Sequence, residues 1–184
     1  MIRKAKYNDV ESIQNLICIF SETGKVLFRS LDEIKENISN FWVYEKNDQL
    51  IGVCSLKKDW GRLVELRSLG VDPRYSGQGI GTKMVEASLK EALSTDCDTL
   101  FVLTYAVSMF KRLGFRTIDK ERLPHKVWND CNACLHQENC DETAMVLSLA
   151  SLRQTKAIQI PLAAYRYNDG NIKIFLSSSY SVLN

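Results

Sequence analysis

The sequence has 184 residues, of which 45% are hydrophobic and 25% charged, so it can bury the core of one domain but has little length left for a second. The net charge of +2, with no basic stripe interleaved with aromatic residues, argues against a general nucleic-acid binder. No run approaches the roughly 18 apolar residues that a membrane span requires, and the N-terminus lacks an apolar leader, so we expect a cytoplasmic protein without a membrane partner.

The first half of the chain predicts two helices followed by three strands. Residues 1–6 are expected to form an initial strand, and Asn8 is expected to cap a helix. The apolar stripe of that helix comprises Val10, Ile13, Leu16, Ile17 and Phe20. Ser30 and Glu33 form a capping box for a second helix. Residues 41–46 and 50–57 resemble strands, with a hairpin turn at Asn47 and Asp48, and 63–71 is the next strand.

The second half predicts a helix after a glycine-rich turn, and then further strands. We expect a strand at 99–104, a short helix at 108–113 that ends at Gly114, and strands at 115–118 and 144–149. The result is an α/β fold over residues 1–150, with a mixed central sheet flanked by helices. Residues 151–184 are expected to form a C-terminal extension with a β-hairpin, whose turn is Asn168-Asp-Gly170.

The glycine-rich turn is the strongest functional motif. Gly77, Gly79 and Gly81 remove side chains where the backbone turns into a helix, so that several N–H groups can converge on one anion at the positive end of the helix dipole. Arg74 can add a full positive charge. The pattern therefore predicts a pyrophosphate site, with the alternative that the glycines only shape the turn.

Arg74, Gly77 and Gly79 resemble the acetyl-coenzyme A signature of the Gcn5-related N-acetyltransferase (GNAT) superfamily, in which a glutamine or arginine precedes two spaced glycines. The order of the expected elements and the segment Phe110-Lys-Arg-Leu-Gly-Phe115 are also similar to that family. The resemblance implies the GNAT acyl-coenzyme A N-acyltransferase fold over 1–150, with acetyl-CoA as co-substrate. The residues that it assigns to acetyl-CoA are Leu69, Gly70, Val71, Arg74, Gly77, Gln78, Gly79, Ile80, Gly81, Thr82 and Phe110.

Direct attack of an amine on a thioester requires that the amine lose its proton, which a nearby carboxylate can accept. Glu65 precedes Val71 by six residues, and the resemblance implies that it is the catalytic base. The alternative is an ion pair with Arg67, which shares its face of the strand. Phe110 stands where many family members carry a tyrosine that protonates the departing thiolate, but a thiol with a pKa of about 8.5 leaves without much help.

A narrower resemblance concerns the acceptor. Four dispersed segments look like short bacterial N-acetylglutamate synthases: residues 27–34, 65–69, 101–104 and 123–131. This resemblance implies acetylation of L-glutamate, the first step of arginine biosynthesis. An amino acid with two carboxylates needs cationic anchors, and Arg29 and Arg67 are the candidates, with added attraction from Lys25 and Lys126. Alternatively, Arg29 is a solvated residue before a helix cap.

The six cysteines favour reduced thiols over a disulfide framework, because Cys18, Cys54 and Cys97 lie in apolar segments. A separate cluster could form a structural zinc site; its members are Cys131, Cys134 and Cys140, with His125 or His136 as a fourth ligand. A zinc motif normally shows two complete cysteine pairs, whereas this cluster has one pair and a third cysteine. We therefore favour thiols that pack in a loop, and predict no metal.

Two other functions compete with glutamate acetylation. One is acetylation of another small amine or of a protein N-terminus, by the same fold. The other is a regulatory module that binds acetyl-CoA without catalysis, which the loss of a hydroxyl at Phe110 and the C-terminal extension make conceivable. The partners expected are a small amino acid and, for the extension, a second copy of the chain in a homodimer.

Overall fold

A seven-stranded mixed sheet forms the centre of the molecule in the computed structural model, which describes residues 1–124, 134, 140–156, 165–168 and 171–174. Its strands lie in the order β1-β2-β3-β4-β5-β7-β6. Only β4 and β5 run parallel; the other neighbours in this sheet are antiparallel. The bounds are β1 Ile2–Lys4, β2 Phe41–Lys46, β3 Gln49–Trp60, β4 Leu63–Val71, β5 Thr99–Thr104, β6 Arg116–Thr117 and β7 Thr143–Ser148.

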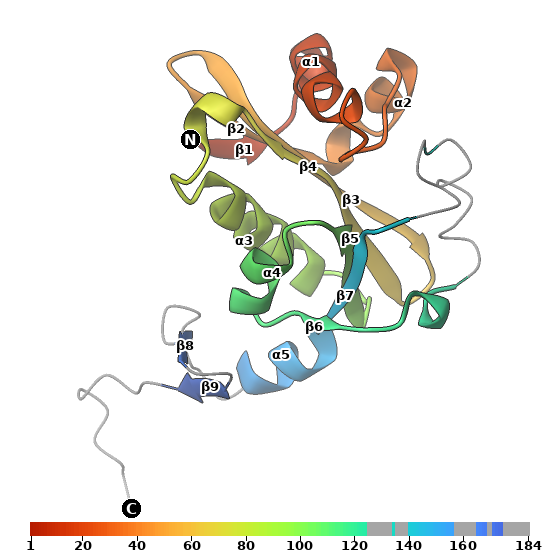
Figure 1. Cartoon of the computed structure of the whole chain (residues 1–184), viewed down its shortest axis with the longest axis vertical. Helices are drawn as coiled ribbons and strands as arrows, with labels where there is room; N and C mark the ends of the chain where they lie inside the picture. Colours follow the sequence, from red (N-terminus) through yellow and green to blue (C-terminus); the bar gives the residue numbers. More distant parts are fainter. Residues whose placement is uncertain (125–133, 135–139, 157–164, 169–170, 175–184) are drawn as a thin grey trace, which may run out of the picture.

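Helices cover both faces of this sheet (Figure 1). The helices α1 (Val10–Ser21) and α2 (Leu31–Glu36) pack on one face, where their apolar residues meet Phe41, Val43 and Val53. The opposite face carries α3 (Ile80–Leu93), and α4 (Val107–Arg112) also packs there. Because side chains alternate along a strand, Cys54 and Leu56 of β3 point to the α3 face while Val53 points to the α1 face.

The predicted α/β architecture and the order of its elements are confirmed. Ser30 caps α2, since its Oγ accepts a hydrogen bond of 3.1 Å from the backbone N–H of Glu33. The hairpin turn also forms as expected, with Asn47 and Asp48 at φ angles of 50° and 57°, the values that a type I′ turn requires.

Two local predictions are wrong. Asn8 does not cap the first helix, because a 3₁₀ turn, η1 (Tyr7–Asp9), precedes α1, and Asp9 takes the polar role there. Asp9 accepts a hydrogen bond of 2.7 Å from the backbone N–H of Lys6 and pairs with Arg3 at 2.7 Å, which lowers its pKa. The strand expected at 115–118 is reduced to β6, because Phe115 turns into the core beside Phe110 instead.

The C-terminal part contains a helix that we did not expect from the sequence, α5 (Leu149–Lys156). Arg153 fixes it to the end of α3, with its guanidinium donating to the carbonyls of Leu93, Thr95 and Cys97 at 3.0, 2.7 and 2.7 Å. Farther along, β8 (Tyr165–Asn168) and β9 (Asn171–Ile174) pair antiparallel, and the turn expected at 169–170 lies outside the described residues. Within the described part of the chain, no helix is long and apolar enough to cross a membrane.

The strand β4 has two irregularities that open the sheet. Its pairing with β5 covers only the positions Leu63↔Thr99, Val64↔Leu100 and Glu65↔Phe101, although both strands continue farther. Beyond Glu65 the two strands therefore diverge. On its other edge, the register with β3 passes from Arg67 opposite Ser55 to Gly70 opposite Val53, so β4 advances three residues where β3 advances two. This extra residue is a β-bulge, which changes the face to which the following side chains point.

Candidate active site

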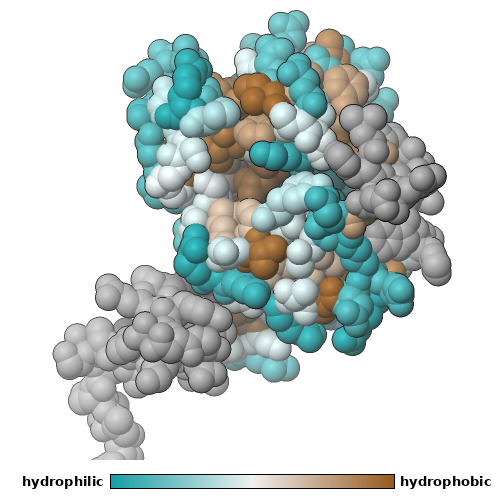
Figure 2. Space-filling view, in the orientation of Figure 1, coloured by the Kyte–Doolittle hydropathy of each residue, from teal (hydrophilic) through white to brown (hydrophobic). Residues whose placement is uncertain are grey.

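A pocket opens where β4 and β5 diverge, between the helices of the two faces. Figure 2 shows the molecule hollowed between the part that carries α1 and α2 and the part that carries α3 and α4, with hydrophobic residues around the hollow. Its walls come from segments that are distant in the sequence: the chain after α1, residues 65–69 of β4, residues 102–106 at the end of β5, α4, and the chain before β7. The pocket is therefore assembled by the fold and not by one motif.

Glu65 lies on the wall of this pocket at the last position where β4 still pairs with β5. Its neighbours Val64 and Leu66 point into the core under α3, so Glu65 points to the opposite face of the sheet. Only 9% of the residue is exposed. A carboxylate at the pocket wall, largely shielded from water, can accept a proton from a group bound in the pocket.

Two arginines converge on one carboxylate next to Glu65. The Nη1 atom of Arg29 lies 2.8 Å from Oε1 of Glu33, and the Nη2 atom of Arg67 lies 3.6 Å from the same oxygen. Both arginines line the pocket, and their side chains are only 10% and 12% exposed. The alternative that Arg29 is a solvated residue is therefore wrong. The arrangement shows that two guanidinium groups can reach one carboxylate here, a geometry suited to binding an anionic substrate.

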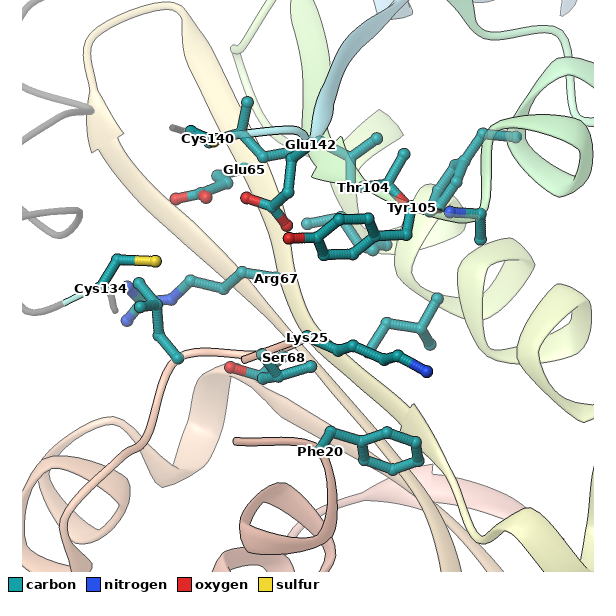
Figure 3. Close-up of a pocket in the computed structure, with 18 of the residues that line it drawn as sticks. Phe20, Lys25, Glu65, Arg67, Ser68, Thr104, Tyr105, Cys134, Cys140 and Glu142 are labelled. Atoms are coloured by element: carbon teal, nitrogen blue, oxygen red, sulfur yellow. Dashed lines mark hydrogen bonds between the residues drawn. The ribbon is translucent and has the colours of Figure 1, made fainter. Parts of the chain in front are cut away.

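Glu142, in the chain just before β7, is a pocket carboxylate for which we predicted no role from the sequence. Its pKa is raised from 4.5 to about 7, mainly by burial and also by the nearby charges of Glu65 and Asp141, while Lys120 opposes the rise. Figure 3 shows the carboxylates of Glu65 and Glu142 on the same side of the pocket. The pocket thus holds two carboxyl groups, one of which carries a proton for part of the time at neutral pH.

Aromatic residues complete the wall on the side of β5. Tyr105 donates a hydrogen bond of 2.7 Å from its hydroxyl to Oδ1 of Asp141, and burial together with the nearby acidic groups raises its pKa. Figure 3 shows its ring reaching into the pocket toward Glu142. Phe110, only 1% exposed, packs edge-on against Phe115 with ring centroids 5.0 Å apart. Tyr105 therefore contributes a hydroxyl group to this wall of the pocket, whereas Phe110 contributes only apolar surface.

The glycine-rich turn forms a separate feature beyond the C-terminal end of β4. Gly77 and Gly79 have φ angles of 75° and 73°, a conformation that side chains rarely adopt, and a Cβ atom at either position would meet no other atom within 4 Å. Gly79 is the N-cap of α3, so the N–H groups of Ile80, Gly81 and Thr82 have no partner within the helix. This exposed helix start suits the phosphates of a nucleotide cofactor.

Arg74, expected to contact the same phosphates, forms an ion pair in this structure. Its Nη2 atom lies 2.7 Å from Oδ2 of Asp72, and its backbone N–H donates to the same carboxyl group at 3.0 Å. The guanidinium lowers the pKa of Asp72, yet the side chain of Arg74 remains 74% exposed. Arg74 is thus tethered at the edge of the turn and accessible from solvent.

The structure brings together some of the expected site residues and separates others. The pocket contains the expected Arg29, Glu65, Arg67, Leu69 and Phe110, together with Lys25. The expected Val71 and the residues of the glycine turn lie beyond it, where β4 leads into α3.

The cysteine cluster is only partly described. Cys134 and Cys140 line the pocket, and Cys18, Cys54, Cys97 and Cys140 are free thiols. Cys131, His125, His136 and Lys126 lie outside the described residues. In the part of the chain that is described, no group of three or more potential metal ligands occurs. The preference for thiols that pack in a loop over a zinc site therefore stays a prediction.

Comparisons with known proteins agree with this arrangement. The model of the acetyltransferase (GNAT) family matches residues 8–115. An uncharacterized N-acetyltransferase of Chlorobaculum tepidum is 35% identical over 148 residues, which cover 80% of this chain and 96% of that protein. An amino-acid acetyltransferase of Mycobacterium tuberculosis is 31% identical over 134 residues, 71% of this chain and 76% of that protein.

A solved structure is also similar to this chain. The crystal structure of N-acetylglutamate synthase from Neisseria gonorrhoeae, complexed with coenzyme A and N-acetyl-glutamate, superposes with a TM-score of 0.72 at 26% sequence identity. The match covers 81% of this chain but 35% of that longer protein. The chain therefore spans about a third of the Neisseria enzyme.

Proposed function

This chain belongs to the GNAT acetyltransferase family and is an acetyl-CoA-dependent N-acetyltransferase; from this premise we propose that its acceptor is the α-amino group of a small amino acid, L-glutamate. The reaction would then be the first step of arginine biosynthesis. We also propose that residues 1–150 carry this activity and that 151–184 form an extension of the domain. The similarity to amino-acid acetyltransferases, and to a synthase crystallised with N-acetyl-glutamate, supports this acceptor.

The observation that carries the proposal is the convergence of Arg29 and Arg67 on the carboxylate of Glu33, beside Glu65. A free amino acid brings carboxylates, and two shielded guanidinium groups can bind them with both charge and geometry. Lys25 adds a third cation to the same wall. An amine without a carboxylate would leave these cations without a partner from the substrate.

Proton transfer follows from the pocket carboxyl groups. An amino acid arrives as an ammonium ion, and Glu65 accepts the proton that must leave before nitrogen can attack the thioester carbon. The new N–C bond forms as the carbonyl π electrons move to oxygen, and the nitrogen, positively charged after the attack, loses a second proton to solvent. The C=O bond then re-forms as the C–S bond breaks, and the electrons of that bond leave with sulfur, which takes up a proton from solvent. Glu142, with a pKa of about 7, can exchange protons with Glu65 and with solvent at neutral pH. The departing thiolate needs little help to leave, since its pKa is about 8.5.

The acetyl donor is acetyl-CoA, which supplies an activated thioester. The glycine turn fits its phosphates, because Gly77 and Gly79 leave open space above the backbone and the first N–H groups of α3 are exposed there. We propose that Leu69, Gly70 and Val71 of β4 bind the arm of the donor through backbone groups. Arg74 would reach the phosphates after exchange of its pairing with Asp72.

A panel of acceptors tests the proposal. Purified protein is incubated with acetyl-CoA and, separately, with L-glutamate, L-glutamine, L-aspartate, a polyamine and a peptide with a free N-terminus, and the release of free thiol is followed. We expect the highest kcat/KM with L-glutamate. Turnover with the peptide or the polyamine, but not with glutamate, would assign a different acceptor. Binding of acetyl-CoA without turnover of any amine would instead favour a regulatory module.

A further inference from the structure

Ser68 combines two unfavourable features at the centre of the β-bulge in β4. Its φ angle is 53°, a conformation that residues other than glycine rarely adopt. In the described part of the chain, the other non-glycine residues with positive φ are Asn47 and Asp48, which form a hairpin turn. Its hydroxyl oxygen is buried and has no hydrogen-bond partner among the described residues, while the whole residue is 7% exposed. Both features cost stability, and neither is needed to complete the sheet.

The bulge places Ser68 in the wall of the pocket. Leu66, Arg67, Ser68 and Leu69 all line this pocket, because it opens at the edge of β4 that β5 has left. Ser68 and Arg67 are neighbours in this wall, and Figure 3 shows Ser68 on the same side of the pocket as Lys25 and Phe20. A buried, strained donor in a pocket wall is typical of a position selected for ligand binding and not for stability.

The charges around Ser68 identify the class of its ligand. The same pocket contains Lys25, Arg29 and Arg67, and the two arginines already converge on a carboxylate oxygen of Glu33. A serine hydroxyl that donates beside guanidinium groups completes a binding site for a carboxylate, because each carboxylate oxygen can accept several hydrogen bonds.

We propose that Ser68 is a specificity-determining residue, whose hydroxyl donates a hydrogen bond to a carboxylate of the acceptor amino acid next to Arg67. This inference rests on the proposed function, since it assumes an acceptor with a carboxylate. It assigns to the bulge a second task besides the opening of the sheet: it turns a side chain of β4 toward the substrate. The binding of substrate then satisfies the hydroxyl that the free protein leaves without a partner.

The test is the substitution Ser68→Ala, measured for both kinetics and stability. We expect the KM for L-glutamate to rise about 10-fold to 100-fold, as for the loss of a hydrogen bond to a charged group, with the KM for acetyl-CoA unchanged. The melting temperature should stay the same or rise, because the substitution removes an unsatisfied buried group. A KM for glutamate within twofold of the wild type would overturn the inference.

Two further variants separate binding from structure. Ser68→Gly removes the hydroxyl and also the strain at positive φ, so it should show the same rise in KM with a larger gain in stability. Ser88→Ala is the matched control, because Ser88 is another fully buried serine, but its hydroxyl lies 3.2 Å from Sγ of Cys54 in the core. The Ser88 variant should lose stability and keep the KM for glutamate. A loss of stability in both Ser68 variants would contradict our account.

Two analogues of glutamate can show which of its two carboxylates Ser68 contacts. We expect the penalty of Ser68→Ala to vanish for one of two analogues of glutamate, either L-glutamine or the α-amide of glutamate, because one of them lacks the carboxylate that Ser68 contacts. An equal penalty for both analogues and for glutamate would overturn the inference.

Failure of the proposed function would be visible separately. If the wild-type protein does not acetylate glutamate, calorimetric titration of L-glutamate into wild type and Ser68→Ala still decides the role of Ser68. Weaker binding by the variant supports that role. Equal affinity, or no binding to either protein, contradicts it.

Discussion

The glycine turn follows the end of β4, and the acceptor pocket is lined by the middle of the same strand, but the two are built in different ways. The turn is one continuous segment whose backbone conformation, with Gly77 and Gly79 at positive φ, forms the site. The pocket is built from side chains of five separate segments, which meet because β4 and β5 diverge. A site formed by backbone groups can bind the same donor in proteins of different sequence. A site formed by side chains can change its acceptor when those side chains are substituted.

This contrast explains why the donor is better defined than the acceptor. The phosphates of acetyl-CoA need N–H groups at a helix start, which any residue can supply if glycine allows the turn. The acceptor needs particular charges at particular places, and here these are Arg29, Arg67 and Glu65. Substitutions in the two regions should therefore change different kinetic constants.

The largest effect is expected for Glu65→Gln, which removes the proposed proton acceptor and nearly preserves its shape. We expect kcat to fall about 10²-fold to 10⁴-fold with little change in the affinity for acetyl-CoA. Steady-state kinetics over a range of pH, together with titration of acetyl-CoA, would check this. An unchanged rate at every pH would remove Glu65 from the mechanism.

Next in size is Arg67→Gln, which removes one guanidinium group from the pocket. We expect the KM for glutamate to rise about 100-fold, the cost of losing a charged partner in a shielded site, while the KM for acetyl-CoA stays constant. The control is Arg62→Gln, since Arg62 precedes the same strand but its side chain is 69% exposed and pairs with Asp98. Equal effects of the two substitutions would mean that Arg67 acts only through general charge.

A smaller effect, on the donor alone, is expected for Gly79→Ala. The φ angle of 73° makes alanine unfavourable by about 1–2 kcal/mol, so relaxation of the turn should weaken acetyl-CoA binding about 10-fold. Gly61→Ala is the matched control in the turn between β3 and β4, with a φ angle of 69° and equally open surroundings. Both variants should lose similar stability, but only Gly79→Ala should bind the donor more weakly. If Gly61→Ala weakens binding as much, the turn has no special role.

The smallest effect concerns stability and pH. Glu142 has a pKa of about 7 in the folded protein against an ordinary value of 4.5, so between these values the folded state binds more protons than the unfolded state. Its contribution to stability is therefore fully present below pH 4.5 and is lost as the pH rises through 7. The melting temperature of the wild type should fall more between pH 5 and pH 8 than that of Glu142→Gln. An equal fall in the melting temperature of the wild type and the variant would contradict the raised pKa of Glu142.

The fold could be predicted from the sequence where local signals and packing agree. The capping residue Ser30, the turn at Asn47 and Asp48, and the regular apolar spacing of α1 and α3 each indicated the structure that forms. The predictions were wrong where a contact between distant parts of the chain determines the local structure. Asp9 replaced Asn8 at the start of α1 because it pairs with Arg3, and α5 is fixed by Arg153, which reaches back to carbonyls at the end of α3.

The candidate site was predictable only in part, for a similar reason. Glu65 could be identified because it precedes Val71 by six residues, and Arg67 because a substrate with two carboxylates needs cationic partners. Glu142 gave no such signal, since its pKa depends on burial and on a neighbour 77 positions away in the chain, Glu65. The positive φ of Ser68 arises from the register between β3 and β4, and no turn residue in the sequence marks it.

The most direct test of the central claim is the stoichiometry of one reaction. Purified protein is incubated with acetyl-CoA and L-glutamate, and both the free thiol and N-acetyl-L-glutamate are quantified over time by mass spectrometry. Our account predicts that the two products appear in equal amounts, and that neither accumulates with Glu65→Gln over the same period. Release of thiol without N-acetyl-L-glutamate, or full activity of that variant, would contradict it.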